Sequence, residues 1–121
     1  MEPYQRAVEI VVPNTYGGEN AFISVPNDRR LVIEHISGEG FCPFGQKLLF
    51  GIKCTANGNE VRHYLGSHTI GNFGAVDYYW FTGLVKFYAD PGSSVMLRVD
   101  RDIAKDEAKA RMTLSGYLEW P

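Results

Sequence analysis

The sequence predicts an all-β protein, an antiparallel β-sandwich of the jelly-roll type with about eight or nine strands. Short runs of Val, Ile, Leu, Tyr and Phe alternate with polar residues along the whole chain. Gly, Pro, Asn and Asp interrupt these runs about every ten residues, a spacing typical of sandwiches. No stretch has the apolar period of a long amphipathic helix. The 121 residues fit one domain, residues 1–121, which is large enough to fold without disulfides or metals.

The strands that we expect are, in chain order, Ala7–Val12, Ala21–Val25, Arg30–Ser37, Lys47–Ala56, Glu60–Leu65, Val76–Phe81, Leu84–Ala89, Ser94–Arg101 and Ala108–Trp120. The segment with the most helical character is DIAKDEAKA, residues 102–110, in which Asp102 is a good N-cap. It is too short to be stable alone, so we predict at most one short helical turn near residues 102–108.

The first three strands end at residues that favour turns. AVEIVV and AFISV each stop at a proline, Pro13 and Pro26, and VPNDR suits a type I turn. RLVIEHIS runs into GEGFCPFG, residues 38–45, which we interpret as a structural loop. A phosphate-binding loop is not expected there, because no Lys-Ser/Thr pair and no helix follow the glycines.

The next two strands form a hairpin whose register the sequence predicts. Asn57 and Gly58 are the strongest signal for a two-residue turn, because both accept a positive φ. The turn places three pairs on the inner face: Phe50 with Leu65, Ile52 with His63, and Cys54 with Val61. On the outer face Tyr64 lies beside Gly51, and Lys53 opposes Arg62.

In the second half of the chain, GSHTIGNFGA is expected to be a loop before the aromatic strand VDYYWF. LVKFYA and SVMLRVDR flank DPGS, which fits a type II turn. The closing strand alternates cleanly, which is typical of a half-buried strand. Its inner face consists of Ala110, Met112, Leu114, Gly116 and Leu118.

The stretches RLVIEHISG, FYADPGSS and LSGYLEWP give the chain a resemblance to known proteins. It resembles small bacterial β-sandwich proteins of unknown function, whose chains also close on a Leu-Ser-Gly-Tyr-Leu run. The resemblance covers most of the chain from about Arg30 onward. It implies a single β-sandwich domain and provides no catalytic residues.

Composition and the N-terminal residues limit the classes of partner and the cellular compartment that we expect for this chain. A net charge of −2 offers no basic field for nucleic acid. MEPYQRAVEIVV lacks the features of a signal peptide, and no apolar run could span a bilayer. We therefore expect a cytoplasmic protein without nucleic-acid or membrane partners, with export by another route left open. Cys42, expected in a loop, and Cys54 are separated by a strand and should be free thiols.

None of the patterns that carry catalysis or bind a metal is present. His35, His63 and His68 lack the His-x-His spacing of a cupin metal site, and we expect His63 to be a hydrogen-bonded core residue. No serine lies in a G-x-S-x-G elbow, and neither cysteine has a neighbour that would lower its pKa. The sequence therefore predicts a non-enzyme with no catalytic residue, metal or cofactor.

One candidate binding surface is an end of the sandwich. Successive antiparallel strands run in opposite directions, so the long glycine-rich loops should gather at one end. Their aromatic, amide and acidic side chains suit a sugar ligand. The candidates are Asn14, Tyr16, Glu19, Phe41, His68, Asn72 and Phe73. The alternative is that Phe41, Phe44 and Phe73 plug the end of the core.

The second candidate surface is a sheet face, because VDYYWF places large side chains on both sides of a strand. The outward residues expected to form an oligomer interface are Tyr64, Tyr79, Phe81, Tyr88 and Tyr117, with Tyr78 and Trp80 as the other possibility. A second copy of the chain is the expected cover, giving a homo-oligomer. The alternative cover is the chain's own segment 104–110.

The sequence thus leaves the function unknown. It favours a non-catalytic binding or assembly module that self-associates through the aromatic face. A carbohydrate-binding module that uses the long loops is the alternative, and an enzyme of unrecognised type is the last one.

Overall fold

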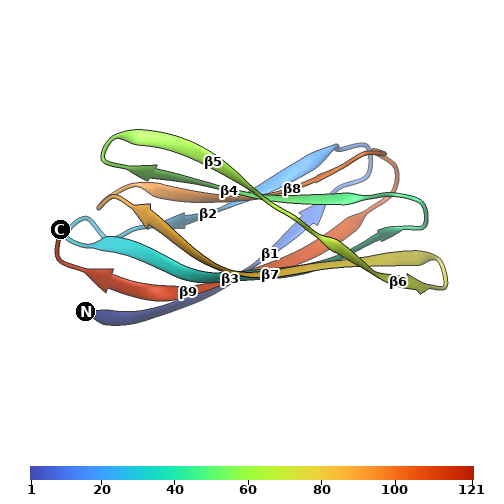
Figure 1. The fold of residues 1–121 in the computed structure, drawn as a ribbon. Helices are drawn as coiled ribbons and strands as arrows, with labels where there is room; N and C mark the ends of the chain where they lie inside the picture. Colours follow the sequence, from blue (N-terminus) through green and yellow to red (C-terminus); the bar gives the residue numbers. More distant parts are fainter.

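The computed structural model describes the whole chain, Met1–Pro121, as two antiparallel β-sheets packed face to face (Figure 1). The sandwich consists of β1 (Glu2–Val12), β2 (Gly18–Ser24), β3 (Arg30–Pro43), β4 (Leu48–Ala56), β5 (Asn59–Leu65), β6 (His68–Phe73), β7 (Val76–Ala89), β8 (Ser94–Arg101) and β9 (Ala108–Glu119). None of its segments is a helix of the length and apolar character that crossing a membrane requires.

The strand order confirms the predicted fold class. The five-stranded sheet has the order β1-β9-β3-β7-β6, and the four-stranded sheet has the order β2-β8-β4-β5. If β6 is set aside, eight strands remain in two four-stranded sheets connected as a jelly roll. Both termini lie at one end of the sandwich (Figure 1). The opposite end, here called the loop end, carries the β1–β2, β3–β4, β6–β7 and β8–β9 connections.

Two segments that we expected to be loops are strands. β3 continues through GEGFC to Pro43, so that Cys42 is a strand residue, and β6 occupies most of GSHTIGNFGA. The glycines of β3 make room for core side chains instead of forming a turn. A Cβ on Gly38 would collide with the ring of Phe81, and one on Gly40 would collide with the side chain of Leu48.

The structure corrects one further expectation about the elements and agrees with another. Residues 76–81 and 84–89 belong to one strand, β7, because a register shift between Ile33 and His35 lets the β3–β7 pair bend without ending. The connection 102–107 contains no helix. Asp102 Oδ1 accepts a hydrogen bond from the Lys47 N–H at 2.7 Å, so this residue caps a neighbouring loop. The connection lies at the loop end and does not cover a sheet face.

The hairpin prediction is confirmed pair by pair. β4 and β5 pair in the expected register, with a φ of 51° at Asn57 and 78° at Gly58. Lys53 faces Arg62 as predicted and forms an ion pair with Glu60 at 3.3 Å. The expectation that His63 is a hydrogen-bonded core residue is wrong: it is half-buried and stacks on the ring of Phe87, at 4.3 Å between centroids.

The two cysteines are free, as the sequence predicts, and both are buried, Cys42 within β3 instead of in a loop. Burial, reinforced at Cys42 by the charge of Asp77, raises the pKa of both thiols to about 11. Because the thiolate is the nucleophilic form, neither Cys42 nor Cys54 is suited to attack a substrate at neutral pH. Cys54 packs in the core as a small apolar side chain.

The turn of the β4–β5 hairpin is held by the carboxylate of Asp90, which lies in the connection between β7 and β8. Asp90 accepts hydrogen bonds from the backbone N–H groups of Asn57 at 2.8 Å and Gly58 at 2.9 Å. Both bonds lower the pKa of Asp90 below its ordinary value, and the bond from Gly58 has the larger effect. A depressed folded pKa means that Asp90 stabilises the native state above its unfolded pKa and loses this effect as the pH falls through the folded pKa.

We therefore expect Asp90→Ala to lower the urea midpoint at neutral pH. The gap in urea midpoint between Asp90→Ala and the wild type should shrink as the pH falls below about 4, because the wild-type carboxylate then becomes protonated. Urea unfolding across this pH range measures the gap. Asp28→Ala is the control, because this carboxylate contacts only the Arg29 guanidinium, at 3.6 Å. A gap for Asp90→Ala that stays constant with pH would contradict the assignment.

Candidate functional site

The predicted loop residues do lie near one end, but their polar groups are engaged within the chain. Asn14 Oδ1 accepts a hydrogen bond from the Asp106 N–H at 2.8 Å. Asn72 Nδ2 donates to Val76 O and to Asp77 Oδ1. Glu19 lies in β2, where its carboxylate accepts from the Asn20 N–H. Asn14 thus joins two connections, Asn72 bonds within the β6–β7 hairpin, and Glu19 bonds to the adjacent residue, which leaves fewer polar groups for a ligand.

The aromatic candidates face outward and do not plug the core. Phe44 and Phe73 are 71% and 59% exposed, so the alternative of a core plug is wrong for them. Phe41 and Phe73 both contact Tyr78, at 5.6 and 5.0 Å between ring centroids. Tyr16 is exposed at the loop end, and its carbonyl accepts from Arg101 Nε.

His68 is not in a loop. It lies in β6 and faces Trp80 in the ladder, at 6.1 Å between their rings. The candidates therefore divide into two groups. Phe41, Phe73, Asn72 and His68 lie on or beside the β3–β7–β6 part of the sheet. Asn14, Tyr16 and Glu19 lie on the β1–β2 side of the sandwich.

The proposed oligomer-interface residues do not form one face. Tyr79 and Phe81 are buried in the core, so their assignment to an interface is wrong. Strand alternation turns them inward, where the Tyr79 hydroxyl donates to Gln46 O at 2.9 Å and Phe81 packs against Phe50 at 4.9 Å. Tyr78 and Trp80 are the outward residues of this strand.

The remaining three tyrosines are divided between the two sheets. Tyr64 lies on the four-stranded sheet, whereas Tyr88 and Tyr117 lie on the five-stranded sheet. Tyr88 and Tyr117 both pair with Val32, which faces outward and is nevertheless fully buried. Near the termini, the chain thus covers its outer sheet face with its own aromatic rings.

The outer face of the five-stranded sheet toward the loop end is built from three rows that cross the strands. The central row runs through paired residues of four strands: Glu9, Arg111, Glu39 and Trp80. The aromatic row lies on the loop side of the central row: Val11, Lys109, Phe41 and Tyr78. The hydroxyl row lies on its other side: Ala7, Thr113, Ser37 and Thr82.

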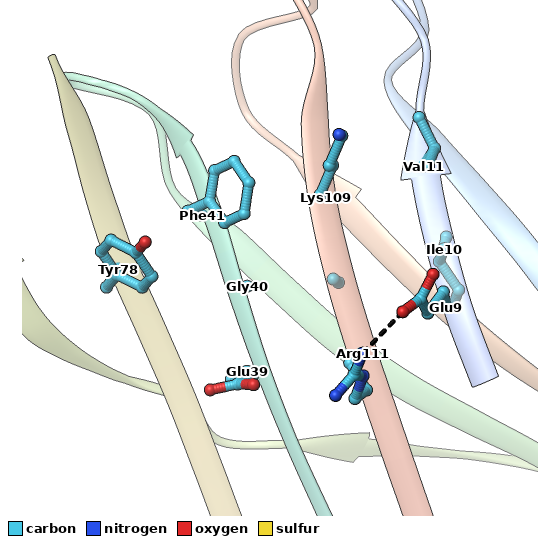
Figure 2. Close-up of a pocket in the computed structure, with 10 residues that line it drawn as sticks. Glu9, Ile10, Val11, Glu39, Gly40, Phe41, Tyr78, Lys109 and Arg111 are labelled. Carbon is cyan, nitrogen blue, oxygen red and sulfur yellow. Dashed lines mark hydrogen bonds and ion pairs between the residues drawn. The ribbon is translucent and has the colours of Figure 1, made fainter. Parts of the chain in front are cut away.

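Two depressions flank the central row. The first, of about 470 Å³, lies between the aromatic and central rows, with Phe41 and Tyr78 on one side and Glu9 and Arg111 on the other (Figure 2). The second, of about 270 Å³, lies over the short side chains of the hydroxyl row and is bordered by Trp80. Glu39 and Arg111 line both depressions.

The charges of this surface are arranged around Arg111. Its Nη2 donates to Glu9 Oε1 at 2.6 Å, and this bond lowers the pKa of Glu9 (Figure 2). Glu9 and then Glu39 raise the pKa of Arg111. Lys109 forms an ion pair with Glu107 at 3.6 Å. The surface therefore places carboxylate acceptors and cationic donors next to partly exposed aromatic rings.

Sequence reasoning found only part of this site. Phe41 was a candidate, and the outward direction of Arg111 follows from strand alternation. For Tyr78 and Trp80, alternation left both directions open, and the prediction that turned Tyr79 and Phe81 outward instead was wrong. Glu9 and Glu39 were missed. Alternation places them on an outer face, but only the strand order brings them to either side of Arg111. No group of three or more His, Cys, Asp or Glu side chains is arranged to hold a metal ion.

The topology defines a jelly-roll β-sandwich, and one of its sheets carries a polar and aromatic surface that is the candidate site. No family model and no curated protein matches the chain. Among solved structures, the chain is similar to the crystal structure of the infectious bursal disease virus VP2 subviral particle. The TM-score is 0.44 and the sequence identity is 14%, and the match covers 93% of this chain and 33% of that chain.

Proposed function

We propose that this chain is a non-catalytic carbohydrate-binding module whose ligand lies on the central and aromatic rows of the five-stranded sheet. The observation that carries the proposal is the register that places the Glu9–Arg111 pair and Glu39 beside Phe41, Tyr78 and Trp80. Aromatic rings suit the apolar face of a sugar ring. Carboxylates accept hydrogen bonds from sugar hydroxyls, and a guanidinium donates to them.

The hydrogen bond from Arg111 makes Glu9 an acceptor and not a proton donor. Glycoside cleavage requires a carboxylic acid whose pKa is raised, so that it can donate a proton. The pKa of Glu9 is lowered by the hydrogen bond from Arg111. Glu9 therefore acts as an acceptor, and its bond fixes the orientation of the Arg111 guanidinium.

Binding to a glycan array, followed by calorimetry on the glycans that bind, tests the proposal. We expect Trp80→Ala and Glu39→Gln each to weaken the binding by on the order of tenfold, the loss of about 1.4 kcal/mol. Tyr64→Ala is the matched control, because Tyr64 is an aromatic residue 64% exposed on the other sheet. No binding to any glycan, or equal losses in Tyr64→Ala, would refute the proposal.

Self-association is a second candidate, favoured by one observation on the same sheet. Leu84 of β7 is 88% exposed on the outer face, beyond the hydroxyl row, and Tyr88 is 41% exposed further along the strand. A second copy that covers Leu84 would remove this apolar surface from water. Light scattering should then give a mass above that of one chain. Leu84→Lys should restore the mass of one chain, whereas Val61→Lys, on β5, should not. A wild type that remains a single chain at all concentrations rules this candidate out.

A further inference from the structure

We infer that the ligand is a linear oligosaccharide that occupies both depressions at once and is held at its middle by the central row. This inference rests on the proposed function and adds the size and shape of the ligand. The two depressions are adjacent, because Glu39 and Arg111 line both. From Phe41 in the first depression to Ser37 in the second, the distance along β3 is about 13 Å, which is longer than one sugar ring.

The two depressions differ in chemistry, and the difference suits successive parts of a chain. The first is walled by the rings of Phe41 and Tyr78, onto which the face of a sugar ring can stack. The second is lined by the hydroxyl groups of Ser37, Thr82 and Thr113, which both donate and accept hydrogen bonds. Thr82 is oriented there by a hydrogen bond to His35 Nε2 at 3.0 Å.

The central row lies between the two depressions and provides the charged side chains at their junction. Arg111 is bonded to Glu9, whereas Glu39 forms no ion pair within the chain. Glu39 lies between Arg111 and Trp80 in the ladder and borders both depressions. It is therefore the free acceptor at the junction, where a bound chain would present hydroxyl groups from neighbouring sugars.

The balance of charge favours a neutral chain over a charged one. The ionised side chains that line the depressions are Glu9, Glu39, Lys109 and Arg111, and both cations are held in ion pairs, Arg111 with Glu9 and Lys109 with Glu107. A uronate-rich polymer would therefore meet no unpaired cation and would be repelled by Glu39, whereas an amine-rich polymer would be repelled by Lys109 and Arg111. The structure thus assigns the surface to a neutral, extended oligosaccharide.

Chain length is the measurement that tests this inference. Neutral series from monosaccharide to hexasaccharide, derived from cellulose, mannan, xylan, chitin and starch, are titrated calorimetrically into the whole protein. In a series that binds, we expect the hexasaccharide to bind on the order of tenfold more tightly than the monosaccharide. Thr113→Val and Ser37→Ala should reduce this gain, whereas Thr55→Val, on the four-stranded sheet, should preserve it.

Fluorescence provides an independent readout of the second depression. The chain has two tryptophans, and Trp120 lies at the opposite end of the sandwich against Arg29, at 4.8 Å. In a Trp120→Phe variant the emission reports on Trp80, which borders only the second depression. We expect long chains to change this emission and monosaccharides to leave it unchanged.

The outcomes separate the inference from the proposed function. A monosaccharide that binds as tightly as the hexasaccharide overturns the two-depression ligand and leaves carbohydrate binding in place. A gain with length that survives both Thr113→Val and Ser37→Ala also overturns it. Failure of all the series to bind overturns the proposed function and this inference together.

Discussion

Gly116→Ala is expected to destabilise the protein by about 3 kcal/mol or more, because the new methyl group would overlap backbone atoms. Gly116 of β9 pairs with Ile33, next to the irregularity in β3. A Cβ there would overlap the carbonyl oxygen of Val32. β3 cannot move aside, because β9 and β7 hold it in ladders on both edges and Val32 itself is fully buried.

Urea unfolding of Gly116→Ala and Gly83→Ala measures this effect against a matched control. Gly83 is also a strand glycine, and a Cβ there meets no atom within 4 Å. Gly83→Ala should therefore change the stability by less than about 1 kcal/mol. If Gly116→Ala does not fold well enough to unfold reversibly, the yield of soluble protein relative to Gly83→Ala becomes the measurement. Equal stabilities, or equal yields, would show that the close approach at Val32 is not a constraint.

Arg101→Met is expected to cost about 3–5 kcal/mol, since it removes a buried cation on which three loops depend. The guanidinium donates to the carbonyls of Pro13, Tyr16 and Lys105 at 2.8 to 3.0 Å. It also donates to Gln46 Oε1 at 3.2 Å. Methionine fills a similar volume but leaves these acceptors without a donor.

Arg62→Met is the control for the loss of an arginine, because Arg62 is exposed on β5 and should change the stability by no more than about 0.5 kcal/mol. The stability of Arg101→Lys should lie between those of Arg101→Met and Arg62→Met. A lysine keeps the charge but lacks the planar guanidinium that reaches several acceptors at once. The urea midpoint, with an unchanged m-value, is the measurement. An Arg101→Met protein as stable as Arg62→Met would contradict the role assigned to this network.

The parts of the fold that could be predicted are those set by local chemistry. Asn57 and Gly58 fix a two-residue turn, and the turn fixes the register of β4 against β5. The closing strand shows its inner face by alternation alone, and Met112 and Leu114 are buried as expected. These inferences hold because the side-chain direction along a strand has a period of two whichever neighbour pairs with it.

Where prediction failed, the local signal was ambiguous. Gly38 and Gly40 resemble loop residues in the sequence, but in the fold their missing side chains make space for Phe81 and Leu48. Tyr79 and Phe81 could not be assigned to a face, because VDYYWF is bulky at every position and alternation does not say which side is the core. The second sheet decides that question by packing Phe50 against Phe81.

By itself, the sequence determined that the chain is an antiparallel sandwich, where its hairpin turns, and which residues of the hairpin strands and of the closing strand point inward. The candidate binding surface was decided by the tertiary structure. Glu9, Glu39 and Arg111 come from three strands that are far apart in the chain, and they meet because β9 inserts between β1 and β3. Strand order depends on how two whole sheets bury their inner faces together, which is a non-local property that short stretches of sequence do not encode.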